Sequence, residues 1–261
     1  MSVSRLSLLF ALVGFLTPAL AAADCPDQAG VDALVKHIDD AQRNGGDWKA
    51  RVFIEQKERD KDDVVYEAAT YRRDADDKLM ILFLRPKAER GKGYLRISKN
   101  LWFYDPRVGK WERRTERERI GGTDSNRADF DESRLFEEYD AKCIGQGKLG
   151  KFQVNKLVLT AKKGIDVGYP KLELWVDVET KNVLKRLDFA VSGKLMRKAL
   201  YPKWRKLFSP SKKADVWFPK QIYIFDMIER GNKTTILIKD VDLNTLPANI
   251  FTKAWLESKS R

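Results

Sequence analysis

The part of the chain that most constrains its fold is residues 78–111, in which apolar segments alternate with short polar turns. The first segment has six consecutive apolar residues, 79–84. An antiparallel strand with one solvated face should alternate, so this run indicates a strand covered on both faces or one that borders an apolar cavity. Arg85-Pro86 and Asp105-Pro106 end two of the segments, because proline lacks the N–H that a strand ladder needs. These features predict an antiparallel meander.

Period-two alternation continues along most of the chain and predicts further strands over residues 48–57, 64–73, 110–115, 152–160, 172–178, 183–191, 217–228 and 234–243. In the segment 183–191 we expect the apolar residues to share one face, namely Val183, Leu187, Phe189 and Val191. Helical spacing predicts helices over 31–43 and 131–139, and residues 246–258 predict a turn and a short helix. Between 117 and 150 the strand pattern lapses, and Gly121-Gly122 indicates a loop. About eleven or twelve antiparallel strands predict a sheet that curls into a barrel or half-barrel.

The N-terminus has the pattern of a secretory signal, with Arg5, a largely apolar run over residues 6–20 and then Ala21-Ala22-Ala23. The run is too short for a membrane-spanning helix. We therefore expect residues 1–23 to be a signal peptide cleaved near Ala23, and residues 24–261 to form one exported domain.

The chain has two cysteines, Cys25 and Cys143. In an oxidising compartment they allow a single intramolecular disulfide, and the alternative is two unpaired thiols. A disulfide would tie the segment 117–150 to the N-terminal helix, so that two helices with apolar faces would lie together over the sheet. The acidic Asp24 argues against lipidation of Cys25, because bacterial lipoprotein signals place a small residue before the cysteine.

A formal net charge of +12 indicates an anionic partner. Export argues against nucleic acid and favours anionic lipid head groups. The strongest local expression is residues 194–213, where eight basic and no acidic residues are interleaved with aromatic ones. This composition is typical of a membrane-surface or docking segment, for which we select Lys203, Arg205 and Lys206. The alternative is a strand followed by a solvated basic loop.

Enzymatic chemistry is not predicted. The sequence has no G-x-S-x-G elbow, no P-loop and no G-x-G-x-x-G after a strand. One histidine, His37, and two distant cysteines do not make a metal-ligand cluster, so we assign no catalytic residue, metal or cofactor.

The sequence resembles the LolA-like family of periplasmic lipoprotein carriers, which sort outer membrane lipoproteins. The most specific match is LWFYDP at residues 101–106, supported by Gly93-Tyr94-Leu95, LELWVDVET at 172–180 and LPANIF at 246–251. The added segments 117–150 and 194–213 make the chain more similar to the divergent branch of this family.

The resemblance implies a mainly β fold of the α+β kind, in which a strongly curved antiparallel sheet forms an incomplete barrel and helices cover its concave face as a lid. The cavity would shield the acyl chains of a lipoprotein or lipid cargo in the periplasm, between an inner-membrane exporter and an outer-membrane acceptor. We expect the carrier to be a monomer.

Two sets of residues are expected to contact the cargo. The predicted cavity lining is Trp48, Val52, Ile54, Met80, Leu82, Leu84, Leu95, Ile97, Trp102 and Tyr104. The predicted lid residues are Leu34, Ile38, Leu135 and Phe136. The inward side of the apolar run stays open, since Leu79, Ile81 and Phe83 could face inward instead. For each residue, ordinary core packing is the alternative to cargo contact.

Two other functions fit the same half-barrel. One is a sensor or regulator that binds a lipid and reports to a membrane protein. The other is a structural periplasmic protein whose sheet is simply closed and packed. An open apolar cavity would exclude the structural function, and a defined signalling partner would favour the regulator over the carrier.

Overall fold

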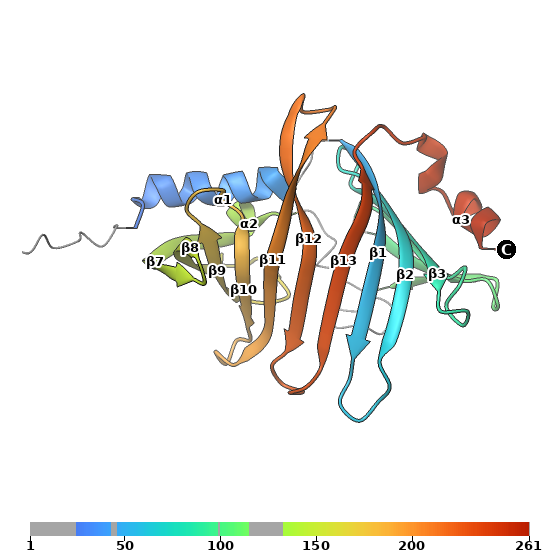
Figure 1. Ribbon diagram of the computed structural model, residues 1–261, viewed down its shortest axis with the longest axis horizontal. Helices are drawn as coiled ribbons and strands as arrows, with labels where there is room; N and C mark the ends of the chain where they lie inside the picture. Colours follow the sequence, from blue (N-terminus) through green and yellow to red (C-terminus); the bar gives the residue numbers. More distant parts are fainter. Residues whose placement is uncertain (1–24, 43–45, 99, 115–132, 261) are drawn as a thin grey trace, which may run out of the picture.

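The computed structural model describes residues 25–42, 46–98, 100–114 and 133–260. In this part of the chain one antiparallel sheet has the strand order β6-β5-β4-β3-β2-β1-β13-β12-β11-β10-β9-β8-β7. Because β6 and β7 are edges that do not pair with each other, the sheet is an incomplete barrel, as predicted. Figure 1 shows the strands following one another around this curved sheet.

The strands are β1 Asp47–Lys57, β2 Val64–Arg73, β3 Lys78–Arg85, β4 Gly93–Ile97, β5 Asn100–Asp105, β6 Lys110–Arg114, β7 Tyr139–Leu149, β8 Phe152–Ala161, β9 Lys171–Asp177, β10 Val183–Phe189, β11 Leu195–Ser209, β12 Ala214–Asp226 and β13 Lys233–Asp242. The predicted meander is confirmed as β3 to β5. β3 and β5 end immediately before Pro86 and Pro106, where the missing N–H was expected to stop them.

One strand lies where the pattern was predicted to lapse. β7 occupies Tyr139–Leu149 and is an edge strand that pairs only with β8. Two glycines weaken its alternation, and its register with β8 shifts between Cys143 and Gly145. The predicted helix over 131–139 shortens to α2, Leu135–Glu138. Residues 131–132 and the predicted Gly121-Gly122 loop lie outside the described residues.

The basic segment 194–213 is strand over residues 195–209 and turn over 210–213, so the alternative of a solvated loop after its first part is wrong. β11 pairs with β12 up to the hairpin turn, where Ser209 lies opposite Ala214. Pro202 lies in a register shift between Leu200 and Lys203, where its missing N–H is tolerated. β12 pairs with β13 only over residues 221–225, and the turn end of the β11–β12 hairpin therefore projects beyond its neighbours (Figure 1).

Helices lie on both faces of the sheet. α1, Gln28–Gln42, and α2 pack against one face near β7 to β9, whereas the 3-10 helix η2, Ala248–Phe251, and α3, Lys253–Lys259, pack against the other face near β3 and β4. Figure 1 places α1 and α3 at opposite ends of the sheet. Within the described residues, no helix combines the length and the apolar character that a membrane span needs.

The predicted disulfide is confirmed. Cys25, just before α1, is bonded to Cys143 of β7. The bond joins the start of the first helix to an edge of the sheet. The predicted signal peptide, residues 1–23, lies outside the described residues.

Candidate functional site

We call the face covered by α1 and α2 the inner face and the opposite face the outer face. Residues directly opposite each other on neighbouring antiparallel strands point to the same side of a sheet. Ile54 of β1 lies opposite Ile236 of β13 and Tyr66 of β2, and Ala68 of β2 lies opposite Phe83 of β3. By alternation, the inner residues of β3 are Leu79, Ile81 and Phe83.

Three apolar clusters cover the inner face. The lid cluster joins α1 and α2 to β7, β8 and β9, the central cluster joins β1 to β11, β12 and β13, and the meander cluster joins β2 to β5. Tyr201 packs against the first two clusters and Tyr66 against the last two. Apolar contacts therefore link the three clusters from one edge region of the sheet to the other.

The ten predicted cavity residues divide between the two faces. Val52 and Ile54 are buried in the central cluster of the inner face, and Trp48 packs against them. The ring of Trp48 meets that of Phe218 edge to face, with 5.4 Å between the ring centroids. These three residues lie where a cavity lining should lie.

The other seven predicted cavity residues lie on the outer face, in what we call the C-terminal cluster. This cluster contains Met80, Leu82, Leu84, Leu95, Ile97, Trp102 and Tyr104 together with residues of η2 and α3. Gly93 of β4 makes room for it, because a Cβ there would come within 2.8 Å of Leu256 in α3. Of the two parities considered for β3, the structure has the one with Leu79, Ile81 and Phe83 inward. The apolar run is continuous because α3 covers its other side.

The four predicted lid residues do come together. Leu34 and Ile38 of α1 and Leu135 of α2 are buried in the lid cluster, and Phe136 packs against it. Asp39 holds the two helices together, because its carboxylate accepts hydrogen bonds from the backbone N–H of Leu135 at 3.0 Å and of Phe136 at 2.9 Å. A side chain of α1 thus caps the first turn of α2.

Side chains of the lid and meander clusters pack closely against one another, whereas Trp48, Tyr66 and Ile222 at the central cluster are only partly buried. Leu157, Leu159 and Leu172 of the lid cluster have no exposed surface, and Phe83 is 1% exposed. One open cleft, of about 670 Å³, lies beside α1 and β7 and is bordered by Val35, Phe136 and Ile144 among others. A second, of about 350 Å³, lies between the β11–β12 turn and the start of β1.

Sequence reasoning missed a charged cluster on the inner side of β10 and β11. Arg186 and Asp188 of β10 lie opposite buried Leu174 and Leu172 of β9, and Arg197 of β11 lies opposite Asp188. The two Asp188 oxygens accept hydrogen bonds from Nε of Arg186 at 2.6 Å and from Nε of Arg197 at 2.7 Å. Burial alone would raise the pKa of Asp188, but the two guanidinium groups outweigh it and hold that pKa below its ordinary value.

The prediction for this strand was wrong because its register with β9 shifts between Val183 and Lys185. Val183 is buried in the lid cluster, but Leu187 and Phe189 follow the shift and alternate with the inward Arg186 and Asp188. Val191 lies beyond the strand and is 92% exposed. The sequence signal was the pair of opposite charges two residues apart in a strand, which places both on one face.

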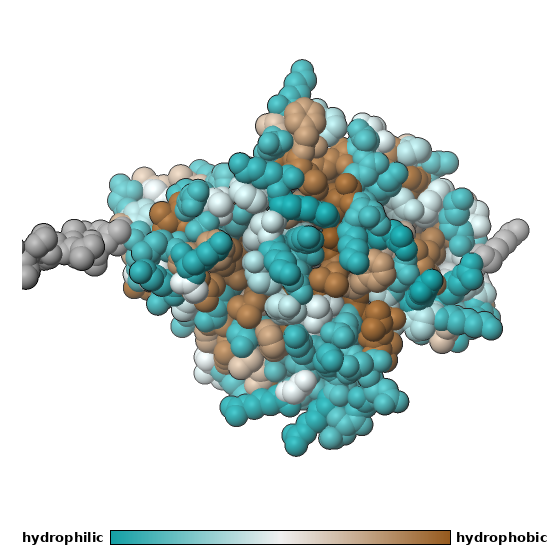
Figure 2. Space-filling view, viewed as in Figure 1, coloured by the Kyte–Doolittle hydropathy of each residue, from teal (hydrophilic) through white to brown (hydrophobic). Residues whose placement is uncertain are grey.

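The three predicted docking residues do not form one surface. Lys203 and Lys206 are exposed, and Lys206 Nζ lies 5.1 Å from the centre of the Trp217 ring. Arg205 is half-buried, and its Nη2 donates a hydrogen bond to the carbonyl of Ile238 at 3.0 Å. Hydrophilic and apolar side chains mix at the projecting hairpin end in Figure 2.

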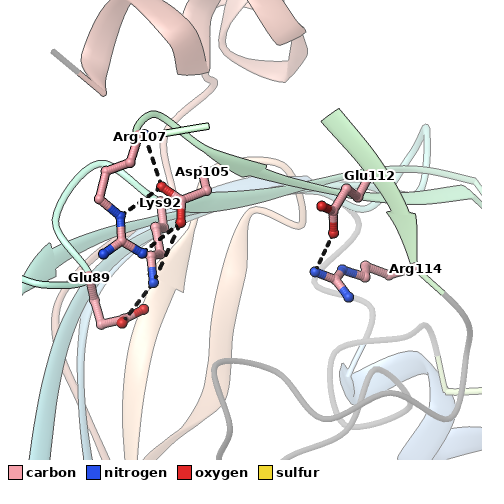
Figure 3. A network of polar contacts seen from close by, with 6 residues as sticks. All are labelled: Glu89, Lys92, Asp105, Arg107, Glu112 and Arg114. Carbon is pink, nitrogen blue, oxygen red and sulfur yellow. Dashed lines mark hydrogen bonds and ion pairs between the residues drawn. The ribbon is translucent and has the colours of Figure 1, made fainter. Parts of the chain in front are cut away.

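The LWFYDP motif ends in a polar network (Figure 3). Arg107 donates from Nη2 to Asp105 at 2.8 Å and from Nε at 3.1 Å, and Lys92 lies 3.7 Å from the same carboxylate. Lys92 also donates to Glu89 at 2.8 Å, while Arg114 pairs separately with Glu112. The hydrogen bond from Arg107 is the main reason that the pKa of Asp105 falls from 3.8 to about 2. The motif therefore fixes the turn that follows β5.

We expect this carboxylate to make stability depend on pH in the acid range. A lowered pKa means that Asp105 stabilises the folded state above pH 4 and that this contribution is lost as pH falls through about 2. Because Arg107 is 64% exposed, solvent screening limits the contribution to about 1 kcal/mol. The measurement is urea unfolding of wild type and Asp105→Asn at pH 6, 4 and 2. The difference between them should shrink at pH 2, and a constant difference would contradict the prediction.

Comparison with known proteins identifies the fold and the family. A protein-family model described as "-like: Uncharacterized protein" matches residues 75–258. No curated protein matches the chain in sequence.

Three solved structures share the architecture. A LolA superfamily protein from Nitrosomonas europaea is 20% identical with a TM-score of 0.70, covering 86% of this chain and 98% of its own. A DUF1329 family protein from Desulfovibrio piger is 19% identical with a TM-score of 0.78, covering 89% and 100%. A domain from Vibrio parahaemolyticus named for outer membrane lipoprotein sorting is 17% identical with a TM-score of 0.75, covering 88% and 100%.

An open antiparallel half-barrel whose apolar inner face is covered by helices near one edge is the LolA-like class of fold. The chain belongs to the family whose model spans residues 75–258, and its fold is LolA-like.

Proposed function

We propose that this protein is a periplasmic carrier that shields the acyl chains of a lipoprotein or lipid on its inner face during transfer towards the outer membrane. The observation that supports this most is the linking of the three apolar clusters of the inner face through Tyr201 and Tyr66. The likeness in fold to a domain named for lipoprotein sorting agrees with it. An acyl chain leaving a membrane must recover about 0.8 kcal/mol for each CH2 group, and a surface of this extent offers the required burial.

The proposed mechanism starts from the packing of α1 and α2 in the lid cluster. Cargo enters when α1 and α2 turn their apolar sides away from the sheet and acyl chains replace Leu34, Ile38 and Leu135 there. Because one apolar surface substitutes for another, the net free energy of the exchange stays small, and release to an acceptor remains feasible. In this proposal an inner-membrane exporter donates the cargo and an outer-membrane protein accepts it.

A structural role is the second candidate function. It is favoured by the burial of inner-face residues such as Ile54, Phe83 and Leu159, which already pack as an ordinary core does. Under this alternative the lid cluster stabilises the fold and does not open to cargo.

Mass spectrometry separates the two functions. The protein is purified from its native periplasm without detergent, denatured, and searched for released lipids or acylated peptides. We expect bound cargo, together with uptake of a fluorescent fatty-acyl probe by the emptied protein. A protein that carries no cargo and takes up no probe would establish the structural role.

The lid contact offers a sharper test of opening. We expect Asp39→Asn to lower the free energy of unfolding by about 1–2 kcal/mol, because an amide leaves only one of the two accepting oxygens for the N–H groups of α2. It should also accelerate exchange of the acyl probe, followed by stopped-flow fluorescence. Asp40→Asn, an exposed neighbour, is the matched control. Destabilisation with exchange at the wild-type rate would show that α2 is not part of a lid.

Docking on an anionic membrane surface is the proposed role of the projecting hairpin. Phe208 is 62% exposed near its turn, and Lys203 and Lys206 of the same strand are also exposed. A basic surface attracts anionic lipid with about 1 kcal/mol for each lysine, and an exposed aromatic ring can enter the head-group layer.

Reversing the two charges tests this role. We expect Lys203→Glu/Lys206→Glu to weaken binding to phosphatidylglycerol vesicles by tenfold or more in a sedimentation assay, since about 1 kcal/mol is lost for each lysine. Arg205 is left in place because it contacts the carbonyl of Ile238. The control Lys148→Glu/Lys163→Glu changes the net charge equally on exposed residues elsewhere. Equal weakening by both variants would reduce the effect to net charge alone.

A further inference from the structure

The geometry points to an anion-binding subsite at Arg186, which takes the carboxylate or phosphate head group of an anionic lipid whose acyl chain lies on the inner face. This inference rests on the proposed carrier function and narrows its cargo to an anionic amphiphile. The residues that carry it are Arg186, Asp188 and Arg197 on the inner side of β10 and β11.

The first observation is that one carboxylate serves two guanidinium groups. Asp188 is fully buried and divides its two oxygens between Arg186 and Arg197. A buried cation normally needs full compensation by charge and hydrogen bonds, because desolvation of an ion is expensive. Arg197 makes further contacts of its own, so the open part of the site is at Arg186.

The second observation is the state of Arg186 itself. Among the described residues its ionic and hydrogen-bond contact is with Asp188 through Nε alone, which leaves the two terminal nitrogens to bind something else. These nitrogens are the part of a guanidinium that binds a carboxylate or a phosphate in a fork.

The third observation is accessibility. Arg186 lies opposite Leu174 of β9 and Ala199 of β11, which are 1% and 2% exposed. The Arg186 side chain keeps 24% of its surface accessible between these two buried neighbours. A small group can therefore reach the guanidinium on a face where the flanking residues are closed.

The fourth observation is position. Arg186 lies three residues after Val183 of the lid cluster in β10 and pairs with Ala199 of β11, which belongs to the central cluster. A head group held here would place its acyl chain along Ile224, Ile236 and Ile54 of the central cluster. The charged and apolar parts of one amphiphile thus match two adjacent parts of one face.

The test compares an acid with its uncharged ester. Binding of cis-parinaric acid and of its methyl ester is followed by the fluorescence of the probe itself. We expect wild type to bind the acid at least tenfold more tightly than the ester, and Arg186→Gln to bring the two affinities together. Arg186→Lys should keep most of the preference because it keeps the charge.

Lys185→Gln is the matched control, since it removes one positive charge from the residue just before Arg186 in β10. Lys185 Nζ lies 3.9 Å from the centre of the Trp175 ring. This control variant should leave the preference for the acid unchanged. Arg186→Gln leaves Asp188 paired with Arg197, and urea unfolding verifies that the variant is folded. If it is not, the acid-to-ester ratio of wild type and Arg186→Lys decides the question alone.

Each outcome has one meaning. Equal affinities for acid and ester in wild type, or an equal loss of both in Arg186→Gln, would overturn the subsite while leaving the carrier function intact. Failure to bind either probe would overturn the carrier function and the subsite with it. Displacement of the acid by lysophosphatidic acid but not by inorganic phosphate at the same concentration supports a lipid head group, and displacement by inorganic phosphate alone would overturn that assignment.

Discussion

Replacing Cys25 and Cys143 together with alanine is expected to lower the free energy of unfolding by about 3–5 kcal/mol. The bond joins residues 118 positions apart, and closing a loop of that length restricts the unfolded chain strongly on the chain-entropy model. The loss also releases the start of α1 from β7, so the lid cluster should loosen before the rest of the sheet. Urea unfolding followed by tryptophan fluorescence measures the first effect, and hydrogen exchange of α1 amides measures the second.

Wild type treated with a reducing agent is the control for this variant, because it opens the same bond without changing any residue. The two should unfold at the same urea concentration. A double variant as stable as oxidised wild type would mean that the helix is held by the lid cluster and by Asp39 alone.

Shortening Leu256 to alanine should lower the free energy of unfolding by about 2–5 kcal/mol and leave acyl binding unchanged. Leu256 is fully buried between α3 and the outer side of β3 and β4, so the substitution removes apolar contacts and leaves a cavity. The outer face carries no part of the proposed cargo surface. Urea unfolding and titration of the folded variant with an acyl probe measure the two effects separately.

Ile54→Ala is the companion variant on the inner face. Ile54 is 3% exposed in the central cluster, and its loss should weaken both the fold and the binding of the probe. Weaker probe binding in Leu256→Ala than in Ile54→Ala would place the cargo surface under α3, where seven of the predicted cavity residues lie.

Much of the fold could be predicted because local chemistry decides it. Proline ends β3 and β5, and the spacing of Val31, Leu34 and Ile38 makes α1 amphipathic, so these elements were located within a few residues. The number of strands predicted the curvature of the sheet, and the resemblance of LWFYDP to a known family agreed with it and added the expectation of a lid. β7 was not predicted because its two glycines interrupt the alternation of apolar and polar residues. As an edge strand it pairs with β8 alone.

The side of a strand is harder to predict than the strand itself. In β3 every residue from Leu79 to Leu84 is apolar, so the sequence does not show which of them face inward. The packing of α3 against Gly93 distinguishes the two faces. In β10 a register shift after Val183 reverses the expected face and turns Arg186 and Asp188 inward. Both results depend on contacts between segments far apart in the sequence.

The attachment of α1 at both of its ends limits how this protein can work. Cys25 is bonded to β7 at the start of the helix, and at the other end four residues separate Gln42 from β1. A helix attached at both ends does not swing away from the sheet about one end. Under the proposed function, α1 would expose its apolar side by rotating about its own long axis, and acyl chains would enter along the length of the helix.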